Sequence, residues 1–361
     1  MMRVLYFLVP MVISLLLEFP VKAIAIKFGW YAKENERTIH HGKIPRVGGL
    51  AIFIAFLIGS VLFVEKNETL RAVIIRGSII FLEGFLDDIF DVSPLVKIVF
   101  QLAAATVLIF MGNVYLKVIR LPFNIVLNIN ILGYIVTYLW IVGITNAVNL
   151  LDGLDGLAGG FCIIVLMTIA IISAIFKIRH SYIISLVLAG STMGFLFHNF
   201  HPASVFMGDC GAQFLGFMIA AISVYSFKST TFITLAIPII LLFVPIFDTF
   251  SAIARRTLGH QKISAPDKKH FHHILMNNLD LGQTGATLTI YCITAVFGFT
   301  AYSYIVDPAT GGTILLLLVI IFEIFIEYTG MISNTYRPIL SILDKIASRH
   351  YHKSDESKSD E

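Results

Sequence analysis

The sequence is poor in charge and in cysteine. Asp, Glu, Lys and Arg make up 14% of its 361 residues and 57% are hydrophobic, whereas ordinary soluble domains are roughly 25% charged. This composition excludes a disordered chain and argues against the two soluble domains that length alone would suggest. A net charge of +3 lacks the basic excess of nucleic-acid binders, so we expect no nucleic-acid partner. The three widely spaced cysteines provide neither a disulfide framework nor a zinc motif.

Long apolar runs make up most of the chain. A membrane span needs about 20 mostly apolar residues. Eleven runs are candidates: 4–27, 47–64, 72–86, 95–111, 131–146, 157–177, 181–198, 211–227, 231–252, 286–306 and 311–330. They predict an all-α polytopic membrane protein with about eleven transmembrane helices in the lipid bilayer.

The charged residues predict which ends of the spans face the cytoplasm. Of the 26 Lys and Arg residues, fifteen lie in the 27–46 loop, the 253–285 loop and the segment after 331, and eight lie on the other side. The positive-inside rule then places the N-terminus outside and the C-terminus in the cytoplasm. Ala23-Ile24-Ala25 resembles a signal-peptidase site, but Glu18 and Lys22 are unsuited to the preceding segment, so we expect the first run to be retained.

This topology defines the domain organisation. We expect a single catalytic transmembrane domain over residues 1–335 and a polar, partly disordered cytoplasmic tail over 336–361. The cytoplasmic loops of the domain are 27–46, 87–94, 146–156, 198–210 and 253–285. All aspartates except Asp307, and all histidines except His180, lie at or near this side. Ionisable residues beside apolar spans are candidates for function, so we predict an active site at the cytoplasmic face of the membrane.

The third run ends in an acidic cluster. Asp87, Asp88 and Asp91 lie at the C-terminal end of a predicted helix, and Pro94 begins the next helix. Carboxylates at that position oppose the helix dipole, so the cluster is unfavourable unless a cation compensates it. A divalent metal or a metal-bound phosphate would do so, and the alternative is a solvated loop. Lys97 is placed to meet a phosphate or to extend toward the membrane surface.

A second cluster has a regular spacing. Asn146, Asn149, Asp152 and Asp155 recur every three residues beside two glycines. A tightened helical turn would place them in one row, with amide donors and carboxylate acceptors suited to a sugar or a nucleobase. A calcium loop of the EF-hand type is excluded because its ligand spacing is absent.

A third cluster surrounds Asp209 at the start of the eighth run. A helix N-terminus favours an anion there, and the flanking Gly208 and Gly211 favour close approach of a ligand to the backbone. The alternative is a simple helix cap. Phe206 could stack on a base or only pack in the protein, and Cys210 is interpreted as a packing residue.

The last cytoplasmic loop is rich in histidine. Ser264 and Asp267 form a predicted capping box, and Phe271, Ile274, Leu275 and Leu279 share one face of the helix that follows. We therefore expect an amphipathic helix lying on the membrane surface. The histidines on its polar side are His270, His272 and His273. They favour phosphate recognition over zinc, while a lipid-headgroup surface is the alternative.

The first cytoplasmic loop adds basic residues to the predicted active site. Those residues are Arg37, His40, His41, Lys43 and Arg46. A membrane-bound site with both signs of charge suggests a phosphorylated soluble substrate, a metal and an anionic lipid.

Taken together, these motifs resemble the polyprenyl-phosphate N-acetylhexosamine-1-phosphate transferase family. The matching segments are HHGKIPRVGG at 40–49, DDIFD at 87–91, NAVNLLDGLDGL at 146–157, HNFHPASVFMGDCG at 198–211 and HFHH at 270–273. They occur in the family's order and cover most of the chain. The related phospho-MurNAc-pentapeptide transferases usually show PTMGG and three adjacent histidines. Here PRVGG and HFHH favour the GlcNAc-1-phosphate branch.

The resemblance implies a reaction in the bacterial inner (cytoplasmic) membrane. UDP-GlcNAc and undecaprenyl phosphate would give undecaprenyl-pyrophosphoryl-GlcNAc and UMP, with Mg²⁺ as cofactor and Mn²⁺ as an alternative ion. A homodimer is compatible with the resemblance. The implied catalytic residues are Asp87, Asp88, Asp152, Asp155, His270, His272 and His273. The implied substrate-binding residues are His41, Lys43, Arg46, Lys97, Asn146, Asn149, Asn199 and Phe206, and the implied metal ligand is Asp209.

Three alternative functions can each be distinguished from this reaction. A phospho-MurNAc-pentapeptide transferase, or a transferase for another UDP-hexosamine, would differ in the sugar donor. An intramembrane aspartyl protease needs Gly-x-Gly-Asp, but position 206 is Phe. A secondary transporter would place paired charges near the midplane, where Arg76 and Glu83 are the one plausible pair in the sequence.

Overall fold

A computed structural model describes residues 2–32, 43–64, 68–120, 126–227, 236–260, 269–332 and 337–342. Its helices are α1 (Met2–Phe28), α2 (Gly49–Phe63), α3 (Glu68–Phe90), α4 (Pro94–Gly112), α5 (Asn130–Leu151), α6 (Leu157–Ile175), α7 (Arg179–Asn199), α8 (Gly208–Phe227), α9 (Ala236–Leu241), α10 (Phe243–Leu258), α11 (Phe271–Asn277), α12 (Gly282–Val306) and α13 (Pro308–Thr329). Two short strands, β1 (Val118–Arg120) and β2 (Val126–Asn128), pair antiparallel between α4 and α5. The all-helical class is therefore confirmed, with this small ribbon as an addition.

The apolar runs of the sequence correspond closely to the helices. Ten runs each match one helix, whereas the 231–252 run contains two helices, α9 and α10, separated at Leu242. Within the described residues, eight helices are long and apolar enough to cross a membrane: α1, α4, α5, α6, α7, α8, α12 and α13. The outer face of α13 exposes large apolar side chains such as Leu316 and Ile321. These features support a multi-pass membrane protein.

Helix α8 lies at the centre of the bundle. It packs against α2, α3, α5 and α6, and Phe214, Phe217 and Met218 on it are fully buried. A helix that is apolar on all sides is expected in such an interior position. Its first turn approaches α2 very closely, because a Cβ atom on Gly49 would lie 2.3 Å from the backbone nitrogen of Gly211.

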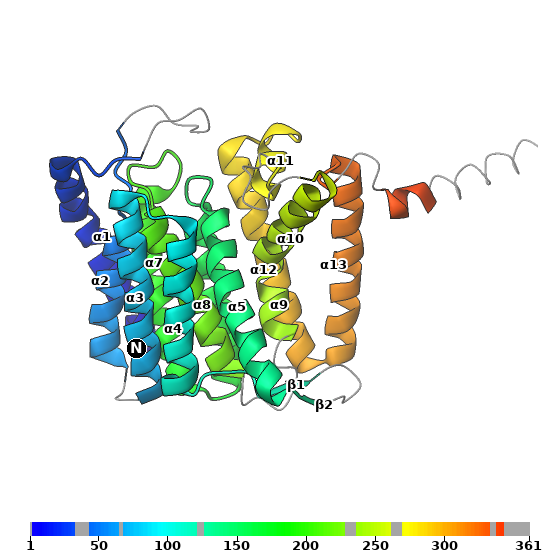
Figure 1. Ribbon diagram of the computed structural model, residues 1–361, viewed down its shortest axis with the longest axis horizontal. Helices are drawn as coiled ribbons and strands as arrows, with labels where there is room; N and C mark the ends of the chain where they lie inside the picture. Colours follow the sequence, from blue (N-terminus) through cyan, green and yellow to red (C-terminus); the bar gives the residue numbers. More distant parts are fainter. Residues whose placement is uncertain are drawn as a thin grey trace, which may run out of the picture.

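Successive helices bring the predicted motifs to one end of the bundle. Figure 1 shows the long helices running side by side, with α11 beside the upper end of α12. The C-terminal ends of α3, α5 and α7 meet the N-terminal ends of α4, α6 and α8, as the contacts described below show. Segments that are far apart in the sequence therefore form a single site.

Candidate active site

Asp209, in the first turn of α8, is held between two cations. Arg46 Nη2 lies 2.6 Å from Asp209 Oδ1, and Lys97 Nζ from α4 lies 2.5 Å from Asp209 Oδ2. The same Lys97 nitrogen lies 2.6 Å from Asp87 Oδ2 at the end of α3. Lys97 thus bridges two acidic clusters predicted separately. It supplies the cation that the sequence required beside Asp87.

Asp88 anchors the start of α8 from the neighbouring helix. Its Oδ1 accepts the N–H of Asp209 at 2.8 Å and its Oδ2 accepts the N–H of Cys210 at 3.0 Å. Arg46 Nε lies 3.3 Å from Oδ1. A carboxylate at a helix N-terminus satisfies otherwise unpaired N–H groups and favours the helix dipole. Asp88 therefore fixes where Asp209 stands, although the sequence alone suggested a catalytic role for it.

The charge balance around Arg46 leaves room for a further cation. Three carboxylates (Asp87, Asp88 and Asp209) face the two positive charges of Arg46 and Lys97. Burial alone would lower the pKa of Arg46, but Asp88 and Asp209 outweigh it and raise that pKa above its usual range. Arg46 stays charged. With all three carboxylates ionised the cluster would carry one excess negative charge, and burial raises the pKa of the Asp88 carboxyl to about 7.

Gly208 permits the contact between Arg46 and α8. Its φ is +75°, and a Cβ atom there would lie 2.1 Å from the carbonyl oxygen of Arg46 and 2.5 Å from Asp88 Oδ2. We expect Gly208→Ala to lower the free energy of unfolding by about 2 kcal/mol or more, from strain at positive φ and from the clash. The melting temperature measures the change. The control is Gly143→Ala, because that position has no atom within 4 Å of an added Cβ. Equal melting temperatures would contradict the expectation.

A chain of amides leads from α5 to Asp209. Asn146 Nδ2 donates to Gln101 Oε1 at 2.7 Å, and Gln101 Nε2 donates to Gln213 Oε1 at 3.0 Å. Gln213 Nε2 and Asn149 Nδ2 lie 3.4 and 3.5 Å from Asp209 Oδ2. Asn146 thus acts through the two glutamines. Gln101 and Gln213 were not among the predicted site residues, although each is the one amide side chain within its apolar run.

Asp152 follows α5 and faces the same cluster. It is partly exposed, and its carboxylate makes no hydrogen bond to any residue in the described ranges. Burial raises the pKa of this carboxyl to about 7, and the negative charge of Asp209 adds to the rise. Its oxygens are therefore available to a donor or a cation from outside the chain.

Asp155 and Asn199 mainly hold neighbouring segments of the backbone in place. Asp155 Oδ2 accepts from His201 Nδ1 at 2.8 Å and from the N–H of Ala203 at 3.1 Å. Asn199 accepts the N–H of Gly156 at 3.0 Å and donates to the carbonyl of Val205 at 2.9 Å. The predicted row of four residues therefore splits, since Asn149 and Asp152 face Asp209 while Asp155 holds the segment after α7.

That segment places Phe206 beside the loop between α1 and α2. The N–H of Phe206 donates to the carbonyl of Pro45 at 2.8 Å, and its own carbonyl accepts the N–H of Gly48 at 2.9 Å. These bonds fix the backbone and leave the ring partly exposed.

Lys43 is exposed, with its Nζ 5.8 Å from the centre of the Tyr31 ring, so it does not join the carboxylates. His41 lies outside the described residues.

The histidine-rich segment packs into the protein. Phe271, Ile274 and Leu275 of α11 belong to the main apolar core, so the expected amphipathic helix on the membrane surface is wrong. The helix ends at Asn277 and leaves Leu279 exposed. The described residues begin again at 269, so the predicted capping box of Ser264 and Asp267 lies outside them. The apolar face covers neighbouring helices rather than lipid.

Asp248 of α10 orients this helix. Its Oδ2 lies 2.8 Å from His270 Nδ1, and its Oδ1 accepts the N–H of Phe271 at 2.8 Å. His272 is buried against Gly153, where an added Cβ would lie 2.6 Å from His272 Nε2. Burial lowers the pKa of His272 to about 3, and the nearby His273 contributes, so this imidazole is neutral at pH 7. Its Nδ1 is buried without a hydrogen-bond partner in the described residues.

Two further expectations concern charge and metal. Arg76 Nε and both Glu83 carboxylate oxygens are buried without hydrogen-bond partners among the described residues, so the suggested membrane-depth pair is wrong. No group of three or more His, Cys, Asp or Glu residues in the described ranges is arranged to hold a metal ion. A metal here would rely on fewer protein ligands.

Comparisons with known proteins identify the family. The family model described as Glycosyl transferase family 4 matches residues 70–227, which contain the segment from Asp87 to Asp209. The chain is 40% identical, over 96% of its length and 98% of the relative, to a probable undecaprenyl-phosphate N-acetylglucosaminyl 1-phosphate transferase of Bacillus subtilis. The chain belongs to the polyprenyl-phosphate N-acetylhexosamine-1-phosphate transferase family. The resemblance drawn from the motifs is thereby confirmed.

Other relatives show how far the similarity extends within this transferase family. A decaprenyl-phosphate N-acetylglucosaminephosphotransferase of Mycolicibacterium smegmatis is 34% identical over 83% of the chain and 82% of its own length. A phospho-N-acetylmuramoyl-pentapeptide-transferase of Caldicellulosiruptor bescii is 36% identical over 55% of the chain and 66% of its own length. The N-acetylglucosaminyl relatives therefore match over more of the chain.

A substitution of Asp248 tests whether the position of His270 matters for the transfer reaction. Asp248→Asn keeps an acceptor for the N–H of Phe271 but removes the negative charge beside His270. We expect kcat to fall about 10–100-fold, as when the outer partner of a functional histidine is lost, with a smaller change in KM. Steady-state kinetics measure this. Asp280→Asn is the control, because Asp280 is exposed near α11. An unchanged kcat for Asp248→Asn would contradict the positioning role.

Proposed function

We propose that the protein transfers GlcNAc-1-phosphate from UDP-GlcNAc to undecaprenyl phosphate, giving undecaprenyl-pyrophosphoryl-GlcNAc and UMP. The relative from Bacillus subtilis carries this activity in its name. The observation that carries the proposal is Asp209 bound between Arg46 and Lys97, with Asp87 on the same lysine. Such a site offers cations to phosphates and carboxylates to a metal.

The residues fit a magnesium ion in this proposal. Mg²⁺ commonly takes one or two carboxylates, several waters and substrate phosphates, so three protein ligands are not required. Asp209 would hold the ion, and the carboxylate of Asp152, which has no bond to the described residues, is a second candidate. Mn²⁺, which also favours oxygen ligands, is an alternative. The bound ion would neutralise charge on the pyrophosphate of the donor.

The chain's own residues would position the two phosphate groups. Lys97 and Arg46 are oriented toward Asp209, so phosphates entering the cluster would meet both cations. His272 is neutral, and its Nδ1 is buried without a partner in the described residues. This side chain would have to leave its buried position to hydrogen-bond a phosphate oxygen. The partly exposed Phe206 ring could stack on uracil. These roles support binding of the nucleotide sugar UDP-GlcNAc between α8 and α11.

Direct attack needs no general base in this scheme. The second pKa of a phosphate monoester is about 6, so undecaprenyl phosphate is largely dianionic at pH 7. One of its oxygens forms a bond to the β-phosphorus of UDP-GlcNAc, and the bond from that phosphorus to the bridging oxygen breaks. UMP leaves with the bridging oxygen and the electron pair. Asp87, which accepts from the N–H of Val92 at 2.7 Å and binds Lys97, positions the cation.

Asp87→Asn tests direct attack. The amide keeps an acceptor for Val92 but weakens the hold on Lys97, so we expect kcat to fall about 10–100-fold and remain measurable. Single-turnover transfer with radiolabelled UDP-GlcNAc measures it. A covalent aspartyl intermediate is the competing scheme. Isolation of a phosphosugar adduct on the protein would overturn direct attack.

The membrane arrangement is also part of the proposal. We place eleven spans in the inner (cytoplasmic) membrane, with the N-terminus outside, the C-terminus in the cytoplasm and the active site at the cytoplasmic face. The excess of Lys and Arg in the loops of that side supports it. Protease accessibility of tags at the two termini in oriented vesicles tests the orientation, and equal accessibility from one side would refute it. The homodimer stays a prediction.

One assay tests the proposed reaction. Purified protein is incubated with radiolabelled UDP-GlcNAc, undecaprenyl phosphate and Mg²⁺, and lipid-linked label and UMP are measured. We expect both products in equal amounts, and the absence of both would refute the transferase. Parallel incubations with UDP-MurNAc-pentapeptide and other UDP-hexosamines determine the sugar. Faster turnover of one of these donors would overturn the GlcNAc assignment.

A further inference from the structure

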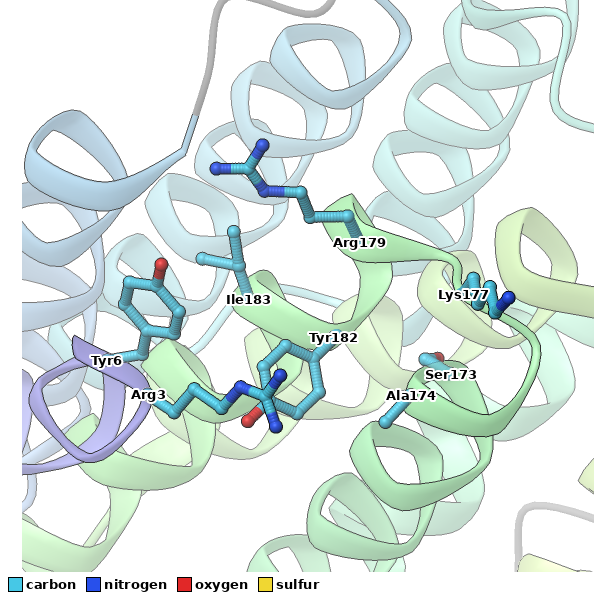
Figure 2. Close-up of a pocket in the computed structure, with 8 residues that line it drawn as sticks. All are labelled: Arg3, Tyr6, Ser173, Ala174, Lys177, Arg179, Tyr182 and Ile183. Atoms are coloured by element: carbon cyan, nitrogen blue, oxygen red, sulfur yellow. The ribbon is translucent and has the colours of Figure 1, made fainter. Parts of the chain in front are cut away.

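A second charged site lies at the opposite end of the bundle. A cavity of about 330 Å³ opens between the start of α1 and the turn that joins α6 to α7. Figure 2 shows Arg3 extended from α1 toward Tyr182 of α7, with Lys177 and Arg179 coming from the turn. Its volume is near the lower end of the roughly 300–1,000 Å³ typical of small-ligand pockets.

The geometry of α7 separates this cavity from the active site. The helix begins at Arg179 beside the cavity and ends at Asn199, which holds the active-site loops. Its 21 residues span about 30 Å, the thickness of the hydrocarbon core of a bilayer. The cavity therefore lies at the level of the opposite membrane surface, where lipid headgroups are found.

The cavity is basic and is not neutralised by its own lining. Arg3 and Lys177 are exposed and form no ion pair with a residue in the described ranges, and the cavity's described lining includes no carboxylate. Tyr6 and Tyr182 form the walls, with ring centres 6.4 Å apart in an edge-on arrangement. Arginine, lysine and tyrosine hydroxyls are donors suited to phosphate oxygens.

We propose that this cavity, formed by Arg3, Lys177, Arg179 and the two tyrosines, binds the phosphate headgroup of an anionic membrane lipid. Cations are disfavoured on the side opposite the cytoplasm, and an anionic headgroup offsets that cost. The headgroup enters between the start of α1 and the turn that joins α6 to α7, and its acyl chains remain beside the apolar outer face of α1. The site is independent of the transfer reaction.

Native mass spectrometry of the full chain tests the proposal with three probes: phosphatidylglycerol, phosphatidylcholine and inorganic phosphate. We expect one retained phosphatidylglycerol, with its affinity reduced at least about tenfold in the double variant Arg3→Gln/Lys177→Gln. Lys117→Gln is the matched control, because Lys117 is exposed at the same end with its Nζ 5.0 Å from the Tyr115 ring, outside the cavity. It should bind like the unmodified protein.

Three other results would each overturn the assignment of this cavity to an anionic lipid. Equal retention of phosphatidylcholine would overturn the preference for an anionic lipid. Displacement of phosphatidylglycerol by millimolar inorganic phosphate would reassign the cavity to free phosphate. Equal lipid affinity in the double variant and the control would refute the site. Charge-conserving Lys177→Arg, which should retain the lipid, separates loss of binding from misfolding.

Discussion

Replacing Asp209 with Asn is expected to reduce GlcNAc-1-phosphate transfer about 10³-fold or more, equivalent to about 4 kcal/mol of transition-state stabilisation. The carboxylate is the common partner of Arg46 and Lys97 and the proposed ligand of the ion. An amide has no negative charge and is a poor magnesium ligand. Both cations would therefore lose their anchor and the proposed metal ligand would be lost with them. Initial rates over a Mg²⁺ titration measure the loss.

The control for Asp209→Asn is a second aspartate at a helix N-terminus. Asp307 caps α13 by accepting from the N–H groups of Ala309 and Thr310 at 3.2 and 3.3 Å, and it lies at the end of the bundle opposite Asp209. Asp307→Asn should change the cap but leave transfer within about twofold. A Mg²⁺ dependence in Asp209→Asn equal to that of the unmodified enzyme would reject Asp209 as the metal ligand.

Replacing Lys97 with Met is the second large change, with transfer expected to fall about 10²-fold or more. Its ammonium group lies 2.6 Å from Asp87 and 2.5 Å from Asp209, and Met keeps the length of the stem without the charge. Asp87 would then lose its cation and Asp209 would keep Arg46 alone, and breaking a buried pair in this way is strongly unfavourable. Initial rates and nucleotide affinity, measured together, distinguish loss of turnover from loss of binding.

Two companion variants sharpen the test on Lys97. Lys97→Arg keeps the charge but presents a planar fork where one nitrogen serves two carboxylates, so we expect activity between that of Lys97→Met and the unmodified enzyme. Lys117→Met removes an exposed lysine at the far end and should have no effect on transfer. Activity of Lys97→Met equal to that of Lys117→Met would exclude the bridging role.

Local sequence patterns predicted the helices well because each span must bury or expose an apolar surface over its own length. The break at Leu242 was missed because the prediction of one run over residues 231–252 rests on the length of the apolar stretch, although Pro238 and Pro245 flank the break. The histidine helix was misplaced for a related reason. An apolar face predicts burial, but Phe271 and Ile274 do not themselves reveal whether lipid or protein covers them.

The sparse charge of the chain was visible at once, and the sequence by itself determined the class of protein, the approximate spans and the motifs of the family. These features are local, because apolar runs and short spacings are written in consecutive residues. The tertiary structure alone decided that Lys97 joins Asp87 to Asp209, that Asp88 caps α8 and that Asp248 holds His270. Those partners come from different helices, and their pairing depends on close approaches such as that of Gly49 to Gly211, which no spacing in the sequence encodes.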